Sequence, residues 1–175
     1  MDWRTVVCIG VGAAALGLLP IRYAADLLAF AVFGAWFVTL IVGLGTDLDQ
    51  RVLPDELTLP VIPVALVYAI SGLNPLVGGD LLLAVLAALV IPAVLYLPSL
   101  AFGAGAFGLG DVKLLIGMGL LLGGERGFGG VLFGLALAGV VLVVLLIAGR
   151  IGRRTYVPFG PFLILGAMWA VLIRI

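Results

Sequence analysis

Long apolar runs alternate with short polar stretches along the whole chain. Each run is bounded by charged residues, proline or clustered glycine, which is the pattern of helices that cross a lipid bilayer. A spanning helix needs about 20 apolar residues. The pattern therefore predicts an all-helical, polytopic transmembrane bundle of about seven spans: Thr5 to Leu19, Leu27 to Leu44, Leu57 to Leu73, Leu81 to Leu97, Val112 to Leu122, Phe128 to Ala148 and Phe159 to Ile173.

Composition supports lipid as the solvent of this chain. Of its 175 residues, 65% are hydrophobic and 10% are charged, whereas ordinary soluble domains carry about 25% charge. Seven spans joined by short loops leave no room for a separate soluble domain. We therefore expect residues 1–175 to form a single integral-membrane domain.

The residues that are missing exclude several kinds of chemistry. The sequence contains no histidine and one cysteine, Cys8. Nucleophiles that depend on an imidazole base and zinc sites of the His-Glu-x-x-His type are therefore excluded. The net charge of zero argues against nucleic acid as a partner, because a phosphate backbone requires a basic surface.

Basic residues favour one orientation of the bundle. If the N-terminus lies inside, the cytoplasmic side holds six of the nine basic residues and the opposite side holds three, in agreement with the positive-inside rule. The loops at 47–56, 103–113 and 150–156 would then all face the cytoplasm. The inner side would hold Arg4, Arg51, Lys113, Arg150, Arg153 and Arg154, and the outer side Arg22, Arg126 and Arg174.

Two carboxylates stand at the cytoplasmic edge of this topology. Asp47 follows the second predicted span and Asp111 opens the fifth, so both are expected at the same depth on the same face. Two neighbouring carboxyl groups do not both ionise easily, and the pair then holds one acid and one base. That combination suits peptide hydrolysis by water, without metal or cofactor.

Glycine surrounds the second of these carboxylates. Gly108 and Gly110 flank Leu109 just before Asp111. Residues without a Cβ let another chain approach the backbone closely, which suits an extended substrate segment. The alternative is that both glycines serve helix packing, as expected for the small-xxx-small steps Gly119 to Gly123 and Gly130 to Gly134.

Three motifs together resemble the type IV prepilin peptidases, which are GxGD-type intramembrane aspartic proteases. The motifs are Asp47 followed by Pro54-Asp55, then Gly108-Leu109-Gly110-Asp111 followed by Lys113, then Pro158-Phe159-Gly160-Pro161-Phe162. They occur in the family's order between about residues 34 and 167. The resemblance implies that Asp47 and Asp111 are the catalytic pair. It also implies cleavage of a prepilin-like leader at the cytoplasmic edge of the inner membrane.

One family feature has no counterpart in this sequence. Larger bacterial members carry a cytoplasmic region with paired Cys-x-x-Cys motifs, associated with methylation of the new N-terminus. Cys8 alone cannot supply a four-thiolate zinc site. The chain therefore resembles the short, peptidase-only members, such as archaeal preflagellin peptidases and the enzymes of tight-adherence pilus systems.

Further residues are assigned roles as hypotheses. The acidic residues Asp55 and Glu56 would attract the basic leader of a substrate, unless they are merely solvated. Pro158 and Gly160 would border the substrate channel, unless they only start the last helix. Lys113 is expected to anchor at lipid headgroups, and Pro54 and Lys113 belong to the structural motif.

Two other classes of protein remain open at this stage. Paired carboxylates at a membrane edge could line a proton or cation path in a small transporter. A non-catalytic assembly factor could bind pilin helices through its glycine faces. We favour the membrane endopeptidase, with prepilin-like proteins and the lipid bilayer as its partners.

Overall fold

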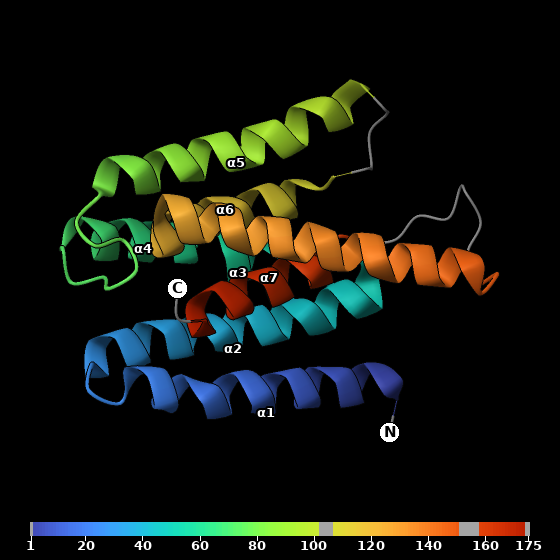
Figure 1. The fold of residues 1–175 in the computed structure, drawn as a ribbon, viewed down its shortest axis with the longest axis horizontal. Coiled ribbons are helices and arrows are strands. Elements are labelled where there is room, and N and C mark those ends of the chain that lie inside the picture. Colours follow the sequence, from blue (N-terminus) through green and yellow to red (C-terminus); the bar gives the residue numbers. More distant parts are fainter. Residues whose placement is uncertain (1, 102–106, 151–157, 174–175) are drawn as a thin grey trace.

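The computed structural model consists of helices joined by short turns. It describes residues 2–101, 107–150 and 158–173, in which every regular element is a helix. The all-helical prediction is confirmed. In chain order (Figure 1) the helices are α1 (Trp3–Tyr23), α2 (Leu27–Gln50), α3 (Asp55–Thr58), α4 (Val61–Ile70), α5 (Leu81–Ala101), α6 (Leu109–Ile147) and α7 (Gly160–Leu172).

The bundle has the surface of a multi-pass membrane protein. Helices α1, α2, α5 and α6 are each long and apolar enough to cross a bilayer, and α7 is a shorter apolar helix. Large apolar side chains remain exposed on the outer faces of these helices, which is favourable only in a lipid environment. Examples are Ile21, Leu27, Leu82, Val143 and Ile147.

Helix α1 is longer than the sequence predicted. We expected Pro20 to end it at Leu19, but the helix continues through Pro20 to Tyr23. The end of α1 is fixed by α7: Tyr23 Oη donates to the Val171 carbonyl at 3.1 Å, and Arg22 Nη1 donates to the Leu172 carbonyl at 3.1 Å. These contacts offset the backbone hydrogen bond that proline removes from a helix interior.

The third predicted span is broken into two helices. Instead of one helix over Leu57 to Leu73, the single turn α3 is followed by α4. Pro60 lies at the junction, where it has no amide hydrogen to donate and restricts the residue before it. Pro54 stands directly before α3, so two prolines set the short helix apart.

The fifth and sixth predicted spans form one helical hairpin, α6. The break is at Gly123, whose φ of 74° and ψ of −172° are not helical. Such a positive φ favours glycine. A Cβ on Gly127 would lie 3.7 Å from Gly119 Cα, so the two arms run side by side in opposite directions (Figure 1).

Asn74 closes the broken end of the first arm. Its side-chain amide donates to the Leu121 carbonyl at 2.9 Å, and its Oδ1 accepts from the Leu76 amide at 2.9 Å. Asn74 is only 2% exposed. A buried carbonyl without a partner would cost about 1–3 kcal/mol, so this one asparagine makes the reversal at Gly123 tolerable.

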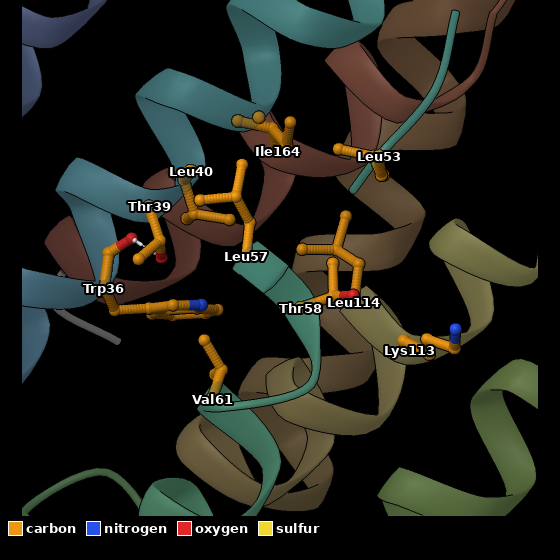
Figure 2. Close-up of a pocket in the computed structure, with 11 residues that line it drawn as sticks. Trp36, Thr39, Leu40, Leu53, Leu57, Thr58, Val61, Lys113, Leu114 and Ile164 are labelled. Atoms are coloured by element: carbon orange, nitrogen blue, oxygen red, sulfur yellow. Dashed lines mark hydrogen bonds between the residues drawn. The ribbon is translucent and has the colours of Figure 1, made fainter. Parts of the chain in front are cut away.

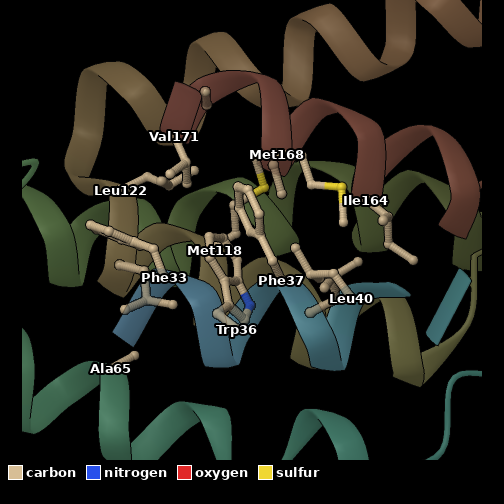
Figure 3. Packing of buried hydrophobic residues seen from close by; sticks show 14 of the residues in the cluster. Phe33, Trp36, Phe37, Leu40, Ala65, Met118, Leu122, Ile164, Met168 and Val171 are labelled. Atoms are coloured by element: carbon tan, nitrogen blue, oxygen red, sulfur yellow. The ribbon is translucent and has the colours of Figure 1, made fainter. Parts of the chain in front are cut away.

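The core lies between α2, the first arm of α6 and α7. Figure 3 shows aromatic rings from α2 packed against methionine and branched side chains from the other two helices. These residues form one continuous buried cluster that fixes α2 and α7 relative to the hairpin. Labelled members are Phe33, Phe37, Met118, Leu122, Ile164, Met168 and Val171.

Glycine allows the second arm of α6 to approach α7. A Cβ on Gly134 would lie 2.6 Å from the Phe162 carbonyl oxygen, and one on Gly130 would lie 2.8 Å from the Gly166 carbonyl oxygen. Both distances are far below van der Waals contact. The packing role predicted for the Gly130 to Gly134 step is confirmed.

Charged side chains are sorted between the two ends of the bundle. At one end, Arg4 Nη1 lies 2.5 Å from Asp49 Oδ1. At the other, Arg22 and Arg126 both donate to the Ile173 carbonyl. This sorting matches the predicted topology, although Arg153, Arg154 and Arg174 lie outside the described residues. Which end faces the cytoplasm stays a prediction.

The glycine contact with α7 can be tested by a single methyl group. We expect Gly134→Ala to destabilise the protein by about 1–3 kcal/mol, because the new Cβ meets backbone that cannot move aside alone. Gly139→Ala is the matched control, since nothing lies within 4 Å of its Cβ position. Thermal unfolding in detergent measures both, and equal midpoints would contradict the close packing.

Candidate active site

A cavity of about 200 Å³ opens where α2 ends and where α6 and α7 begin. It contains six of the residues singled out in the sequence, from three distant motifs. Asp47 and Asp111 both line it, as the topology predicted. The complete lining is Asp47, Arg51, Val52, Leu53, Gly108, Leu109, Gly110, Asp111, Pro158, Phe159 and Gly160.

Asp47 lies in the last turn of α2 and is largely enclosed. Asp47 is only 5% exposed, and its Oδ2 has no hydrogen-bond partner among the described residues. Its carbonyl accepts the Arg51 amide at 2.9 Å, where Arg51 ends the helix in the left-handed conformation. A buried carboxylate oxygen without a partner is costly, which makes Asp47 a candidate functional residue.

Gly160 at the start of α7 presses against Asp47. A Cβ at position 160 would lie 2.5 Å from Asp47 Oδ2 and 2.9 Å from Asp47 Cγ. Any side chain there would displace the carboxylate. The glycine of the third motif therefore shapes the wall of the cavity at one of its acids, a closer role than the channel border that we expected.

Asp111 is held by the first turn of α6. Gly108 is the N-cap residue, and its amide donates to Asp111 Oδ2 at 3.2 Å. The partial positive charge of a helix N-terminus favours a carboxylate at this place. Asp111 Oδ2 thus caps the N-terminus of α6, and this hydrogen bond holds the Asp111 side chain at the cavity.

Gly110 brings the start of α6 against the segment that follows α2. A Cβ at position 110 would lie 2.9 Å from Leu53 Cβ and 3.0 Å from the Leu53 carbonyl oxygen. The absence of a side chain therefore permits a direct backbone contact. This contact places the residue after Gly110, Asp111, in the same cavity as Asp47.

Lys113, which we expected to anchor at lipid headgroups, has a partner within the protein. Its Nζ lies 2.5 Å from Asp55 Oδ1, so an ion pair joins the first arm of α6 to α3. Pro54 precedes α3, and its carbonyl accepts from the Thr58 hydroxyl at 3.3 Å. The ion pair and the proline together hold the chain between Asp47 and α4.

Asp55 and Glu56 lie outside the carboxylate cavity. Asp55 faces Lys113, and Glu56 is exposed at a separate groove between α2 and α4. Their predicted attraction for a basic leader stays a prediction. Within the described residues, no group of three or more His, Cys, Asp or Glu side chains is arranged to hold a metal ion.

Sequence reasoning missed several residues that line the cavity. Arg51 was singled out only for its charge, and Val52 and Leu53 were not singled out, yet all three line the cavity; Phe159, which also lines it, belongs to the turn expected at the substrate channel. Their position between two motif residues was the available signal. Leu53 matters most, because its backbone meets Gly110 and its side chain reaches toward Ile164 in a smaller neighbouring cavity (Figure 2).

The fold and this site define a polytopic membrane protein with two carboxylates from different helices in one cavity. Comparison with known proteins identifies the group to which it belongs. Residues 31–148 match the model of the type IV leader peptidase family, a stretch that includes both carboxylates. The chain belongs to this family.

Three relatives carry the name prepilin leader peptidase/N-methyltransferase. Identity is 32% to that of Burkholderia pseudomallei (strain 1026b), over 89% of this chain and 50% of the relative. The protein of Xanthomonas campestris pv. campestris is 34% identical, over 79% of this chain and 49% of the relative. The protein of Aeromonas salmonicida (strain A449) is 32% identical, over 72% of this chain and 43% of the relative.

The chain spans about half the length of the curated relatives that it matches. No solved structure matches it. The family therefore rests on the sequence comparison, and the arrangement of the site rests on the structure of this chain.

The ion pair between α3 and α6 can be measured by a double-mutant cycle. We expect Asp55→Asn and Lys113→Met to show a coupling of about 0.5–1 kcal/mol in unfolding free energy, reduced by solvent at the exposed carboxylate. Glu56→Gln with Lys113→Met is the control cycle, with coupling near zero. Equal couplings in the two cycles would contradict a specific Asp55–Lys113 contact.

Proposed function

We propose that this protein is a membrane-embedded aspartic endopeptidase that removes the leader of prepilin-like substrates at the cytoplasmic face of the inner membrane. The observation that carries the proposal is the convergence of Asp47 and Asp111 in one cavity. They come from helices whose sequences are far apart. Membership of the type IV leader peptidase family supports the same activity.

The two carboxyl groups would act as one acid and one base. Coulomb repulsion in a partly enclosed site favours a state in which the pair holds a single proton. The ionised member takes a proton from water as the water oxygen attacks the scissile carbonyl carbon. The protonated member donates toward the departing amine nitrogen, the C–N bond breaks, and the proton taken from water restores the pair.

Backbone without side chains would receive the substrate. Gly108, Gly110 and Gly160 all line the cavity. An extended peptide can approach such backbone closely. A helical amide is already hydrogen-bonded within its own helix, so the substrate must unwind at the bond that is cut.

The relatives' names describe two activities, and we propose only the peptidase for this chain. The cavity accounts for hydrolysis of a peptide bond by two carboxylates. Asp55 and Glu56 would add negative charge near the site and favour a basic leader. The proposed partners are prepilin-like proteins and the lipid bilayer.

The proposed orientation follows from the basic residues. Arg4 and Lys113 lie at the end of the bundle that holds the carboxylate cavity, and Arg22 and Arg126 lie at the opposite end. The positive-inside rule favours the first end as cytoplasmic. Asp26 caps the start of α2 at the far end, so it lies at the opposite end of the bundle from the carboxylate cavity and does not extend that cavity into a transporter path.

Replacing either carboxylate should abolish cleavage. We expect Asp47→Asn and Asp111→Asn each to lower the rate by about 100-fold or more, because general acid and base catalysis contribute this much. Asp49→Asn is the matched control, since Asp49 is exposed and pairs with Arg4. The measurement is the appearance of a shortened prepilin in proteoliposomes, followed by mass spectrometry.

Retention of cleavage by both Asn variants would overturn the two-carboxylate mechanism. Thermal unfolding of each variant shows that the protein remains folded. We expect no loss of stability at Asp47, because its buried oxygen has no hydrogen-bond partner among the described residues.

A further inference from the structure

A groove of about 380 Å³ separates α2 from α3 and α4. Helix α2 packs mainly against α1 and α7, whereas α4 packs mainly against α6, and the groove is lined by residues of α2, α3, α4 and α6 and of the turn between α3 and α4. The floor is Leu121, which is 1% exposed. The walls are Ala31, Val32, Ala35, Trp36 and Thr39 on one side, and Glu56, Leu57, Pro60, Val61, Val64 and Ala65 on the other.

The groove and the carboxylate cavity are neighbours through a small cavity that shares lining residues with each of them. Trp36, Thr39, Leu57 and Val61 line both the groove and the small cavity of Figure 2. Leu53 lines both that small cavity and the carboxylate cavity. A row of neighbouring spaces therefore leads from the lipid-facing groove to Asp47 and Asp111.

The groove is polar at one end only. Its polar members, Thr39 and Glu56, lie toward α3, and the opposite end is lined by apolar residues such as Ala31 and Leu121. Ala31 and Ala35 stand one turn apart on α2, which lets a second helix approach closely in lipid. An occupant with an apolar helix and a polar end directed at the carboxylates fits this arrangement.

We infer that the groove binds the apolar helix of a membrane-anchored substrate while the preceding segment enters the carboxylate cavity. The inference rests on the proposed function and adds a docking surface to it. Thr39 precedes Asp47 by eight residues of α2, which is about 12 Å of helix. About four extended residues cover that distance, so the bound helix begins a few residues beyond the bond that is cut.

Cross-linking tests where the substrate helix lies. The enzyme carries Cys8→Ala and Asp47→Asn, and one new cysteine on a groove wall, Ala35→Cys or Val64→Cys. The probe is a purified prepilin with a single cysteine in its apolar helix. The control is Ala14→Cys, which is exposed on α1. We expect disulfide formation at both groove positions to exceed that of the control by about tenfold or more, the ratio that a binding preference of about 1.4 kcal/mol produces.

Filling the groove supplies a second, independent readout. We expect Ala35→Trp to lower kcat/KM for the prepilin by about tenfold, since lost docking energy of about 1.4 kcal/mol has this effect. Cleavage of a short peptide that contains the leader and cleavage site but no apolar helix should not change. Ala14→Trp, on the exposed face of α1, is the matched control for bulk and membrane insertion.

The outcomes separate the two proposals. Cross-linking at positions 35 and 64 no stronger than at 14, with unchanged kcat/KM in Ala35→Trp, would show that the substrate helix does not occupy the groove and would overturn this inference. The proposed peptidase would then stand unaffected. Absence of prepilin cleavage by the unmodified protein would overturn the proposed function, while groove-specific cross-linking would still support the docking surface.

Discussion

The structure depends on two close contacts in which a glycine backbone packs directly against the segment that carries Asp47. Gly110 meets the Leu53 backbone, and Gly160 meets the Asp47 carboxyl group. A methyl group at either position would push apart segments that now touch. Two acids from α2 and α6 share one cavity because these two positions lack a Cβ, and the buried core of α2, α6 and α7 keeps the helices in that register.

Lipid explains why the polar groups gather as they do. A bilayer offers no hydrogen bonds to a broken helix or a lone charge, so such a group needs a partner within the protein or a place at an end of the bundle. Asn74 satisfies the carbonyl freed at the Gly123 reversal, and Lys113 pairs with Asp55. Among the described residues, the buried side-chain atoms without a partner are Arg4 Nε, Asp47 Oδ2 and Tyr68 Oη. Of these three, Asp47 Oδ2 belongs to a residue that lines a cavity together with a second acid.

Most of the fold and the meeting of the two acids were predictable from the sequence. Hydrophobic runs locate the helices, and alternation of spans places Asp47 and Asp111 at one end. The reversal at Gly123 was not predictable, because twelve glycines crowd the region from 103 to 134 and periodicity cannot select the one with positive φ. The Lys113–Asp55 pair and the Gly160–Asp47 contact depend on how helices pack, which no local pattern encodes.

The central claim is that the side chains at positions 47 and 111 meet in one cavity. The most direct measurement uses Asp47→Cys and Asp111→Cys together in a Cys8→Ala background, treated with a short bifunctional thiol reagent in membranes. Our account predicts an efficient intramolecular cross-link, and none for Asp47→Cys with Asp80→Cys, which stands before α5 at the opposite end. Equal reaction of the two pairs, or none in the first, would contradict it.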